Sequence, residues 1–120
     1  MVRVLVNGAC GRMGQAVIKA VLEDKELSLV AAVDLKGGMD AGTLVGLPAC
    51  GVVVTVGLEE AIATARPEVM VDFTRPSAVF QNAVTALRKG VSPVIGTTGL
   101  SAEEETELAK IAEETGTPAF

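Results

Sequence analysis

Short runs of apolar, mostly β-branched residues alternate along the chain with longer stretches whose apolar residues recur at helical spacing. Met13, Val17 and Val21 lie four residues apart, which places them on one face of a helix from Arg12 to about Asp24. The runs predicted as strands are Val2–Asn7, Leu27–Asp34, Val52–Thr55, Val69–Phe73 and Val91–Ile95, and the other predicted helices are Leu58–Ala65, Ser77–Lys89 and Ser101 to about Thr115. This alternation predicts a Rossmann-like α/β fold, with a parallel sheet, right-handed crossovers and helices on both faces.

The last two predicted helices carry recognisable capping residues. Pro76 stands at the start of one helix, where its missing N–H is not needed, and Gly90 follows that helix. Ser101 and Glu104 form a capping box for the next helix, and Gly116 ends it. These residues therefore mark where both helices begin and end.

One segment, Leu35 to Gly51, matches neither pattern. It contains five glycines and Pro48, and it is long for a connection inside a compact domain. We therefore expect a functional or mobile loop rather than a plain link.

Composition narrows the possible classes of protein. The chain has 120 residues, which corresponds to a single domain, and its only aromatic residues are three Phe. A core built from Val, Ala, Leu and Ile suits parallel strands covered by helices. The net charge of −5 argues against a nucleic-acid-binding surface, and the acidic residues between positions 103 and 114 are predicted to form a solvated helix face.

Cysteine and histidine usage excludes further chemistry. Cys10 and Cys50 do not form a CxxC pair and the chain has no His, so no metal site is predicted. We expect reduced, partly buried thiols in a cytoplasmic protein. The chain lacks an apolar run of membrane-spanning length and the layout of a signal peptide, so no membrane association is expected. Without His, no side chain titrates near neutrality by default, and we assign no catalytic residue to this chain.

A glycine-rich turn between the first strand and the first helix carries the clearest chemistry. Gly8 lets the chain leave the sheet sharply, Gly11 lets the backbone approach a diphosphate, and Gly14 lets the helix lie close to the strand. The N–H groups at the helix N-terminus favour an anion, and Arg12 adds a positive charge there. Asp34 follows Gly14 by twenty residues, at the end of the second strand, where a ribose-binding carboxylate is expected. The pattern predicts binding of NADH or NADPH; the alternative is a purely structural glycine turn.

The residues after the second strand leave the choice of cofactor open. Asp34 alone favours NADH, because a carboxylate repels a 2′-phosphate. Lys36 can pair with that phosphate and offset the repulsion, or it can be an ordinary solvated loop lysine. We expect use of both cofactors or a weak bias between them.

A second group of candidate residues follows the fourth predicted strand. Ligands of open α/β sheets bind at the carboxyl ends of strands, where Phe73, Thr74 and Arg75 stand. Phe73 is interpreted either as a neighbour of the nicotinamide or as a core residue, and Arg75 either as a site residue or as a surface residue. Asp72 is predicted to accept hydrogen bonds that shape the turn.

A third group follows the fifth predicted strand, where Gly96 and Gly99 bracket Thr97 and Thr98. Exposed amides and hydroxyls in such a loop can hold a carboxamide or a substrate carboxylate. The alternative is a common Ser/Thr turn that leads into a helix.

Together these motifs resemble the N-terminal domain of the dihydrodipicolinate reductase family of bacterial lysine and diaminopimelate synthesis. The resemblance rests on NGACGRMGQ at 7–15, VDFTRPSAV at 71–79 with Asn82 after it, and VIGTTGLS at 94–101. It implies hydride transfer from NADH or NADPH to the cyclic dicarboxylate made by dihydrodipicolinate synthase. By position, the diphosphate would lie on Gly8, Ala9, Cys10, Gly11, Arg12 and Met13, and the adenosine ribose on Asp34. The same resemblance places Phe73 and Arg75 beside the cofactor, Gly96, Thr97 and Thr98 at the nicotinamide, and Thr98 also at the substrate.

The chain departs from the family in one large respect. The family's substrate domain carries a paired His followed by a proton-donating Lys, and the chain ends before any such signature. The resemblance therefore implies a cofactor-binding domain, residues 1–120, of a two-domain reductase, cut near the hinge. It further implies a homotetramer for the full-length enzyme and a monomer or weak dimer for this chain. We expect nucleotide binding with negligible turnover.

Two other functions remain open from the residues alone. The chain could be the cofactor domain of another two-domain Rossmann reductase, such as a homoserine or aspartate dehydrogenase or a sugar-type oxidoreductase. It could also be a coenzyme A-binding or nucleotide-sensing module, which needs no catalytic His.

Overall fold

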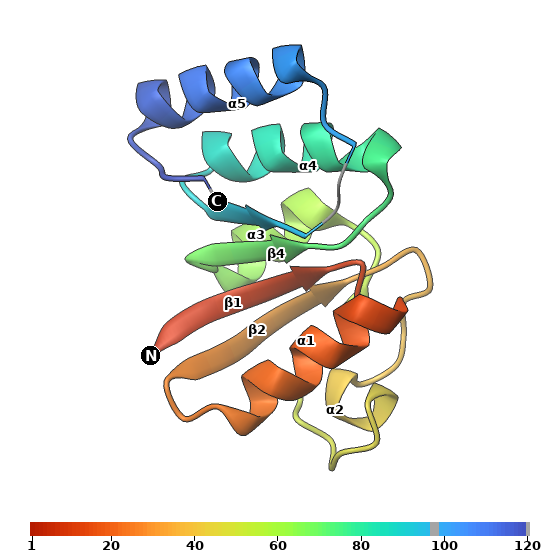
Figure 1. Ribbon diagram of the computed structural model, residues 1–120. Helices are drawn as coiled ribbons and strands as arrows, with labels where there is room; N and C mark the ends of the chain where they lie inside the picture. The colour runs from red at the N-terminus through yellow and green to blue at the C-terminus, as the bar shows by residue number, and fades with distance from the viewer. Residues whose placement is uncertain (97–98, 120) are drawn as a thin grey trace.

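The computed structural model describes residues 1–96 and 99–119, and in these residues a parallel five-stranded sheet is covered by helices on both faces (Figure 1). The strand order is β3-β2-β1-β4-β5, so the fold is Rossmann-like. The strands are β1 (Val2–Asn7), β2 (Leu27–Val33), β3 (Val54–Thr55), β4 (Val69–Asp72) and β5 (Ser92–Ile95). The helices are α1 (Arg12–Glu23), α2 (Ala41–Leu44), α3 (Leu58–Ala65), α4 (Pro76–Arg88) and α5 (Ala102–Thr115).

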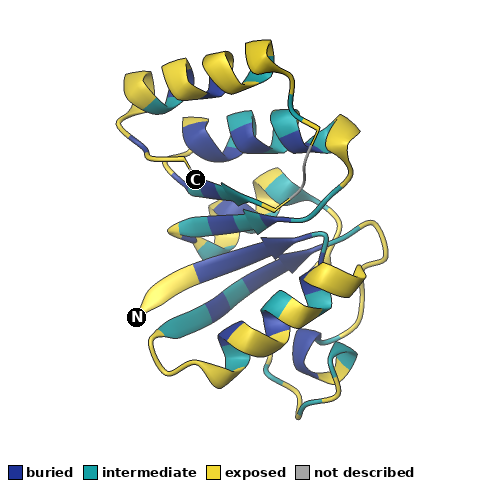
Figure 2. Cartoon of the chain, in the orientation of Figure 1, coloured by how far each residue is buried: buried dark blue, intermediate teal, exposed yellow. Residues whose placement is uncertain are grey.

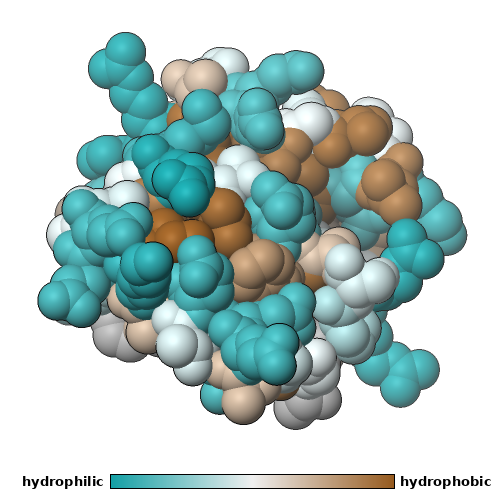
Figure 3. All heavy atoms as spheres, turned by 90° about the horizontal axis from the view of Figure 1, so that it is seen from above, coloured by the Kyte–Doolittle hydropathy of each residue, from teal (hydrophilic) through white to brown (hydrophobic). Residues whose placement is uncertain are grey.

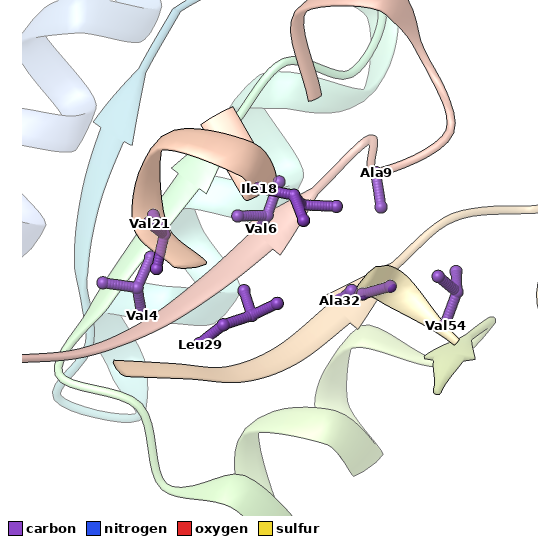
Figure 4. Close-up of a cluster of buried hydrophobic side chains, with 9 residues drawn as sticks. Val4, Val6, Ala9, Ile18, Val21, Leu29, Ala32 and Val54 are labelled. Atoms are coloured by element: carbon purple, nitrogen blue, oxygen red, sulfur yellow. The ribbon is translucent and has the colours of Figure 1, made fainter. Parts of the chain in front are cut away.

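The central strand β1 is buried on both faces from Val4 to Val6, which explains its apolar run there. Val4 and Val6 pack with Ile18 of α1 on one face (Figure 4), while Leu5 packs with Met70 on the other. Side chains of successive strand residues point to opposite faces, so a run of Val and Leu is needed where both faces are covered. Figure 2 shows the burial concentrated in the strands and in the inward helix faces.

Helix α5 forms an outer layer on α4 rather than on the sheet. Leu108 and Ile111 pack on Ala83 and Leu87 of α4. The acidic residues of α5 lie on its other side and are exposed, apart from the half-buried capping residue Glu104. Figure 3 views the molecule from the α5 side and shows mostly hydrophilic side chains, with hydrophobic groups between them. The prediction of a solvated acidic helix face is therefore confirmed.

The helix boundaries agree closely with the capping signals. Pro76 is the first residue of α4, Gly90 follows that helix with φ +75°, and Gly116 ends α5 with φ +68°. The capping box of Ser101 and Glu104 is present in both directions. These ends were predictable because each depends on local backbone hydrogen bonds.

The segment from Leu35 to Gly51 differs from the expectation of a loose loop. It contains the short helix α2, whose N-cap is Asp40. Asp40 also forms an isolated antiparallel bridge with Val53. The strand β3 has two residues instead of the predicted Val52–Thr55. A single carboxylate therefore organises a segment whose glycines suggested mobility.

Candidate functional site

The two central strands, β1 and β4, end side by side at the point where the strand order reverses. Asn7 and Asp72, their last residues, are register partners. From here the chain moves toward β2 on one side and toward β5 on the other. Open α/β sheets bind their ligands in the crevice at such a switch point.

A cleft of about 480 Å³ opens at this edge. Its lining comes from the ends of β1 and β2, the segment from β3 into α3, the turn after β4 and the first turns of α4. The lining residues are Asn7, Gly8, Gly11, Val33, Asp34, Leu35, Val56, Leu58, Phe73, Thr74, Arg75, Ala78 and Asn82. The tertiary structure thus brings the glycine turn, Asp34 and the Phe73–Arg75 group to one cavity.

The three glycines of the turn after β1 differ in whether the fold requires a glycine at their position. Gly8 has φ +84°, and an added Cβ would lie 3.0 Å from the carbonyl carbon of Phe73. At Gly14 a Cβ would overlap the carbonyl oxygen of Gly8. A Cβ added at Gly11, by contrast, would lie 3.5 Å from the carbonyl oxygen of Gly8, which is an ordinary contact distance, and the φ of Gly11 is −73°. The fold therefore requires Gly8 and Gly14, whereas Gly11 is not required by packing and leaves open space on the cleft.

The first turn of α1 presents uncapped backbone N–H groups. Gly11 is the N-cap, and within the described part of the chain no side chain caps this helix. The initial N–H groups of a helix have no partner inside it, so they can bind an anion. Arg12 stands exposed at the same place. The binding of a diphosphate at this helix N-terminus stays a prediction.

Asp34 lies at the cleft and is hydrogen-bonded on both oxygens. Oδ2 accepts the Cys10 N–H at 2.9 Å, and Oδ1 accepts the Lys36 N–H at 3.1 Å. Each oxygen keeps a second lone pair for a ribose hydroxyl. Burial, with the nearby charge of Asp34, raises the pKa of the Cys10 thiol above its ordinary value. Lys36 is exposed just outside the cleft lining.

Phe73 lies partly inside the protein and partly at the cleft, and its place beside the nicotinamide stays a prediction. It is half-buried and lines the cleft, while its ring lies on Gly96, where a Cβ would overlap the ring. Gly99 packs similarly on Pro76, with a Cβ distance of 2.9 Å, and has φ +115°. Both glycines of this loop are thus explained by contact with the turn after β4. Thr97 and Thr98, the predicted nicotinamide and substrate residues, lie outside the described residues.

A buried polar network supports the turn after β4. Asp72 is fully buried, and its carboxylate accepts the Thr74 N–H at 2.8 Å, the Thr74 hydroxyl, and the Asn7 side chain at 3.5 Å. The Asn82 side chain, from α4, donates to the Thr74 hydroxyl oxygen at 3.1 Å. The predicted turn-shaping role of Asp72 is confirmed. Sequence reasoning missed both partners. Asn7 is 65 positions from Asp72 and reaches it only because β1 pairs with β4, and Asn82 reaches Thr74 from helix α4.

The described residues contain neither a cluster of metal ligands nor a membrane-spanning helix. Across residues 1–96 and 99–119, no three His, Cys, Asp or Glu side chains gather as metal ligands would. Over the same ranges, none of the helices combines the length and the apolar character that crossing a membrane requires.

Comparison with known proteins places the chain in a family. The model of the family described as "Dihydrodipicolinate reductase, N-terminus" matches residues 2–120. The chain belongs to this family. The 4-hydroxy-tetrahydrodipicolinate reductase of Moorella thermoacetica is 49% identical over 113 residues, which are 93% of this chain and 42% of that relative. The same enzyme of Synechocystis sp. is 44% identical over 98% of this chain and 45% of its own length.

Solved structures share the fold of this chain. A dipicolinate-bound dihydrodipicolinate reductase from Paenisporosarcina sp. TG-14 superposes with a TM-score of 0.83 and 35% identity, over 99% of this chain and 46% of that one. The WlbA dehydrogenase from Thermus thermophilus, solved with NAD and α-ketoglutarate, shares the fold with a TM-score of 0.78 at 19% identity, over 100% of this chain and 40% of that one. The chain thus spans less than half the length of these dihydrodipicolinate reductase relatives.

Proposed function

We propose that this chain binds NADH or NADPH in the cleft at the β1–β4 switch point. The proposal rests on Gly11. Packing within the protein does not require a glycine there, and the residue faces the cleft beside an uncapped helix N-terminus. A Cβ there would occupy the space that a diphosphate needs. Gly8, Ala9, Cys10, Arg12 and Met13 complete that seat.

The remaining cofactor contacts follow from the positions of side chains around the cleft. Asp34 would hold the adenosine ribose, and the exposed Lys36 beside it would reduce the repulsion of a 2′-phosphate. Phe73 and Arg75 line the cleft on the β4 side, where the nicotinamide would lie. Gly96, Thr97 and Thr98 complete this end by their place in the sequence.

We further propose that residues 1–120 are the cofactor-binding domain of a two-domain 4-hydroxy-tetrahydrodipicolinate reductase. A bound dihydronicotinamide supplies a hydride, and this chain's residues hold and orient the ring. The described residues contain no His and no clustered metal ligands. A second domain would therefore bind the dicarboxylate, with Thr98 contributing from this side, and supply the proton. Family membership supports this assignment.

Calorimetric titration of the 120-residue chain with NADH, NADPH and coenzyme A tests nucleotide binding. We expect both pyridine nucleotides to bind, and coenzyme A to bind much more weakly. Arg12→Gln should weaken binding about threefold to tenfold, because one charge at the diphosphate is lost. Arg88→Gln is the matched control, since Arg88 is exposed at the end of α4, at the opposite edge of the sheet. Preference for coenzyme A, or equal effects of the two substitutions, would refute the proposed site.

A further inference from the structure

Three polar atoms of Cys10, in the middle of the glycine turn, are each held by a different neighbour. Its N–H donates to Asp34 Oδ2 at 2.9 Å, and its thiol donates to the Lys36 carbonyl at 3.4 Å. Its carbonyl oxygen accepts a hydrogen bond from the Gln15 side chain at 2.8 Å. Residue 10 is therefore fixed both to the end of β2 and to the first turn of α1.

The rest of the turn is also satisfied internally. The N–H groups of Gly8 and Ala9 both donate to the Val33 carbonyl, at 2.9 and 3.1 Å, and the Gly11 N–H donates to the Gly8 carbonyl at 3.2 Å. The backbone from residue 8 to residue 11 thus uses its own N–H groups to keep its shape. A turn whose shape is set before a ligand arrives avoids the entropy cost of ordering it on binding.

We propose that Asp34 and Gln15 are positioning residues that set the shape of the diphosphate seat through Cys10. The inference rests on the proposed nucleotide binding and assigns Asp34 a role besides its expected contact with the ribose. Gln15 acts only through the turn, so its loss affects NADH and NADPH equally. Asp34 acts in two ways, through the charge that opposes a 2′-phosphate and through the acceptor that holds Cys10.

Two substitutions at position 34 separate these roles. Asp34→Asn removes the charge but keeps an oxygen that can accept the Cys10 N–H, whereas Asp34→Ala removes both. NADPH is the informative ligand, because its 2′-phosphate replaces the hydroxyl that a carboxylate would bind. We expect Asp34→Asn to bind NADPH as tightly as the wild-type chain or more tightly, and Asp34→Ala to bind it about tenfold more weakly than Asp34→Asn.

Gln15→Met tests the hydrogen bond that holds the Cys10 carbonyl to α1. The substitution keeps the length of the side chain and removes its N–H donor, so we expect both nucleotides to bind about threefold to tenfold more weakly. Lys19→Met, one turn further along α1 at an exposed position, is the control and should change neither affinity by more than about twofold.

Amide hydrogen exchange of Cys10, followed by NMR without nucleotide, reports directly on the hydrogen bond from its N–H to Asp34. We expect slow exchange in the wild-type chain, Asp34→Asn and Lys19→Met, and at least tenfold faster exchange in Asp34→Ala. If the wild-type chain binds NADPH but Asp34→Ala and Gln15→Met bind it equally well, the positioning role is wrong and the proposed function stands. If the wild-type chain binds neither nucleotide, the proposed function is wrong, and the proposed effect of Asp34 and Gln15 on nucleotide affinity is wrong with it.

Discussion

The turn after β1 and the loop after β5 are both rich in glycine, and both lie at the carboxyl edge of the sheet. In the loop after β5, Gly96 lies under the ring of Phe73 and Gly99 packs on Pro76. Both glycines there are explained by contacts within the protein. Their presence therefore reflects the close packing of Gly96 on Phe73 and of Gly99 on Pro76, and is no evidence of a ligand.

The turn after β1 contains one glycine of a different kind. Gly14 is required because a Cβ would overlap the backbone of Gly8, but Gly11 has ordinary space around it and an unstrained backbone. A glycine that internal packing does not require is the better indicator of an external group close to the backbone. A glycine motif therefore indicates a ligand site only where packing within the protein does not itself require the glycine.

Gly14→Ala should have the largest effect on stability. The new methyl group would meet a backbone oxygen, which cannot move without separating α1 from β1. We expect a loss of about 3 kcal/mol or more in the free energy of unfolding. Chemical denaturation measures it, and a loss below about 1 kcal/mol would contradict the close approach of helix and strand.

Gly96→Ala should have an intermediate effect. The obstacle is the ring of Phe73, a side chain that can rotate toward the cleft, so we expect a loss of about 1–2 kcal/mol. The double variant with Phe73→Leu should recover part of this loss, because the smaller side chain makes room. Strictly additive losses in thermal or chemical denaturation would show that the two residues do not contact each other.

Gly11→Ala should leave stability within about 0.5 kcal/mol of the wild-type chain. Its effect should appear in nucleotide binding, with the Kd for NADH raised about tenfold, because the methyl group enters the diphosphate space. Calorimetry and denaturation on the same sample separate the two quantities. A large loss of stability without a change in affinity would make Gly11 structural, like Gly96.

The smallest effect is expected in the segment between β2 and β3, where a carboxylate rather than a glycine holds the shape of the loop. The Asp40 carboxylate accepts N–H groups of Cys50, Thr43, Gly51 and Gly42, chiefly that of Cys50, and its pKa is lowered from 3.8 to about 2. A folded-state pKa below the unfolded value contributes stability above pH 4, which is lost as pH falls from about 4 to about 2.

Amide exchange of Cys50 and Gly51 against pH measures this contribution. We expect protection to fall in that range in the wild-type chain. In Asp40→Asn, which has no carboxyl at this position, protection should not depend on pH there. A wild-type profile that is flat down to pH 2 would show that the carboxylate does not hold the loop.

Much of the fold could be predicted because its signals are local. The strand runs, the capping box at Ser101 and the helix ends at Gly90 and Gly116 depend on side-chain periodicity and on backbone groups a few residues away. The helix α2 was missed because it spans only four residues, and because its N-cap residue Asp40 also holds Cys50 and Gly51, ten and eleven positions further on. No local pattern contains that information.

The sequence by itself determined the α/β class, the glycine turn and the presence of Asp34 at the end of the second strand. Only the tertiary structure decided which glycine the packing does not require, which residues share a cleft, and how Cys10 and Asp72 are held. The physical reason is that these properties depend on contacts between strand ends far apart in the sequence. Parallel pairing of β1 with β2 and β4 brings those ends to one edge, and no periodicity along the chain records which atoms meet there.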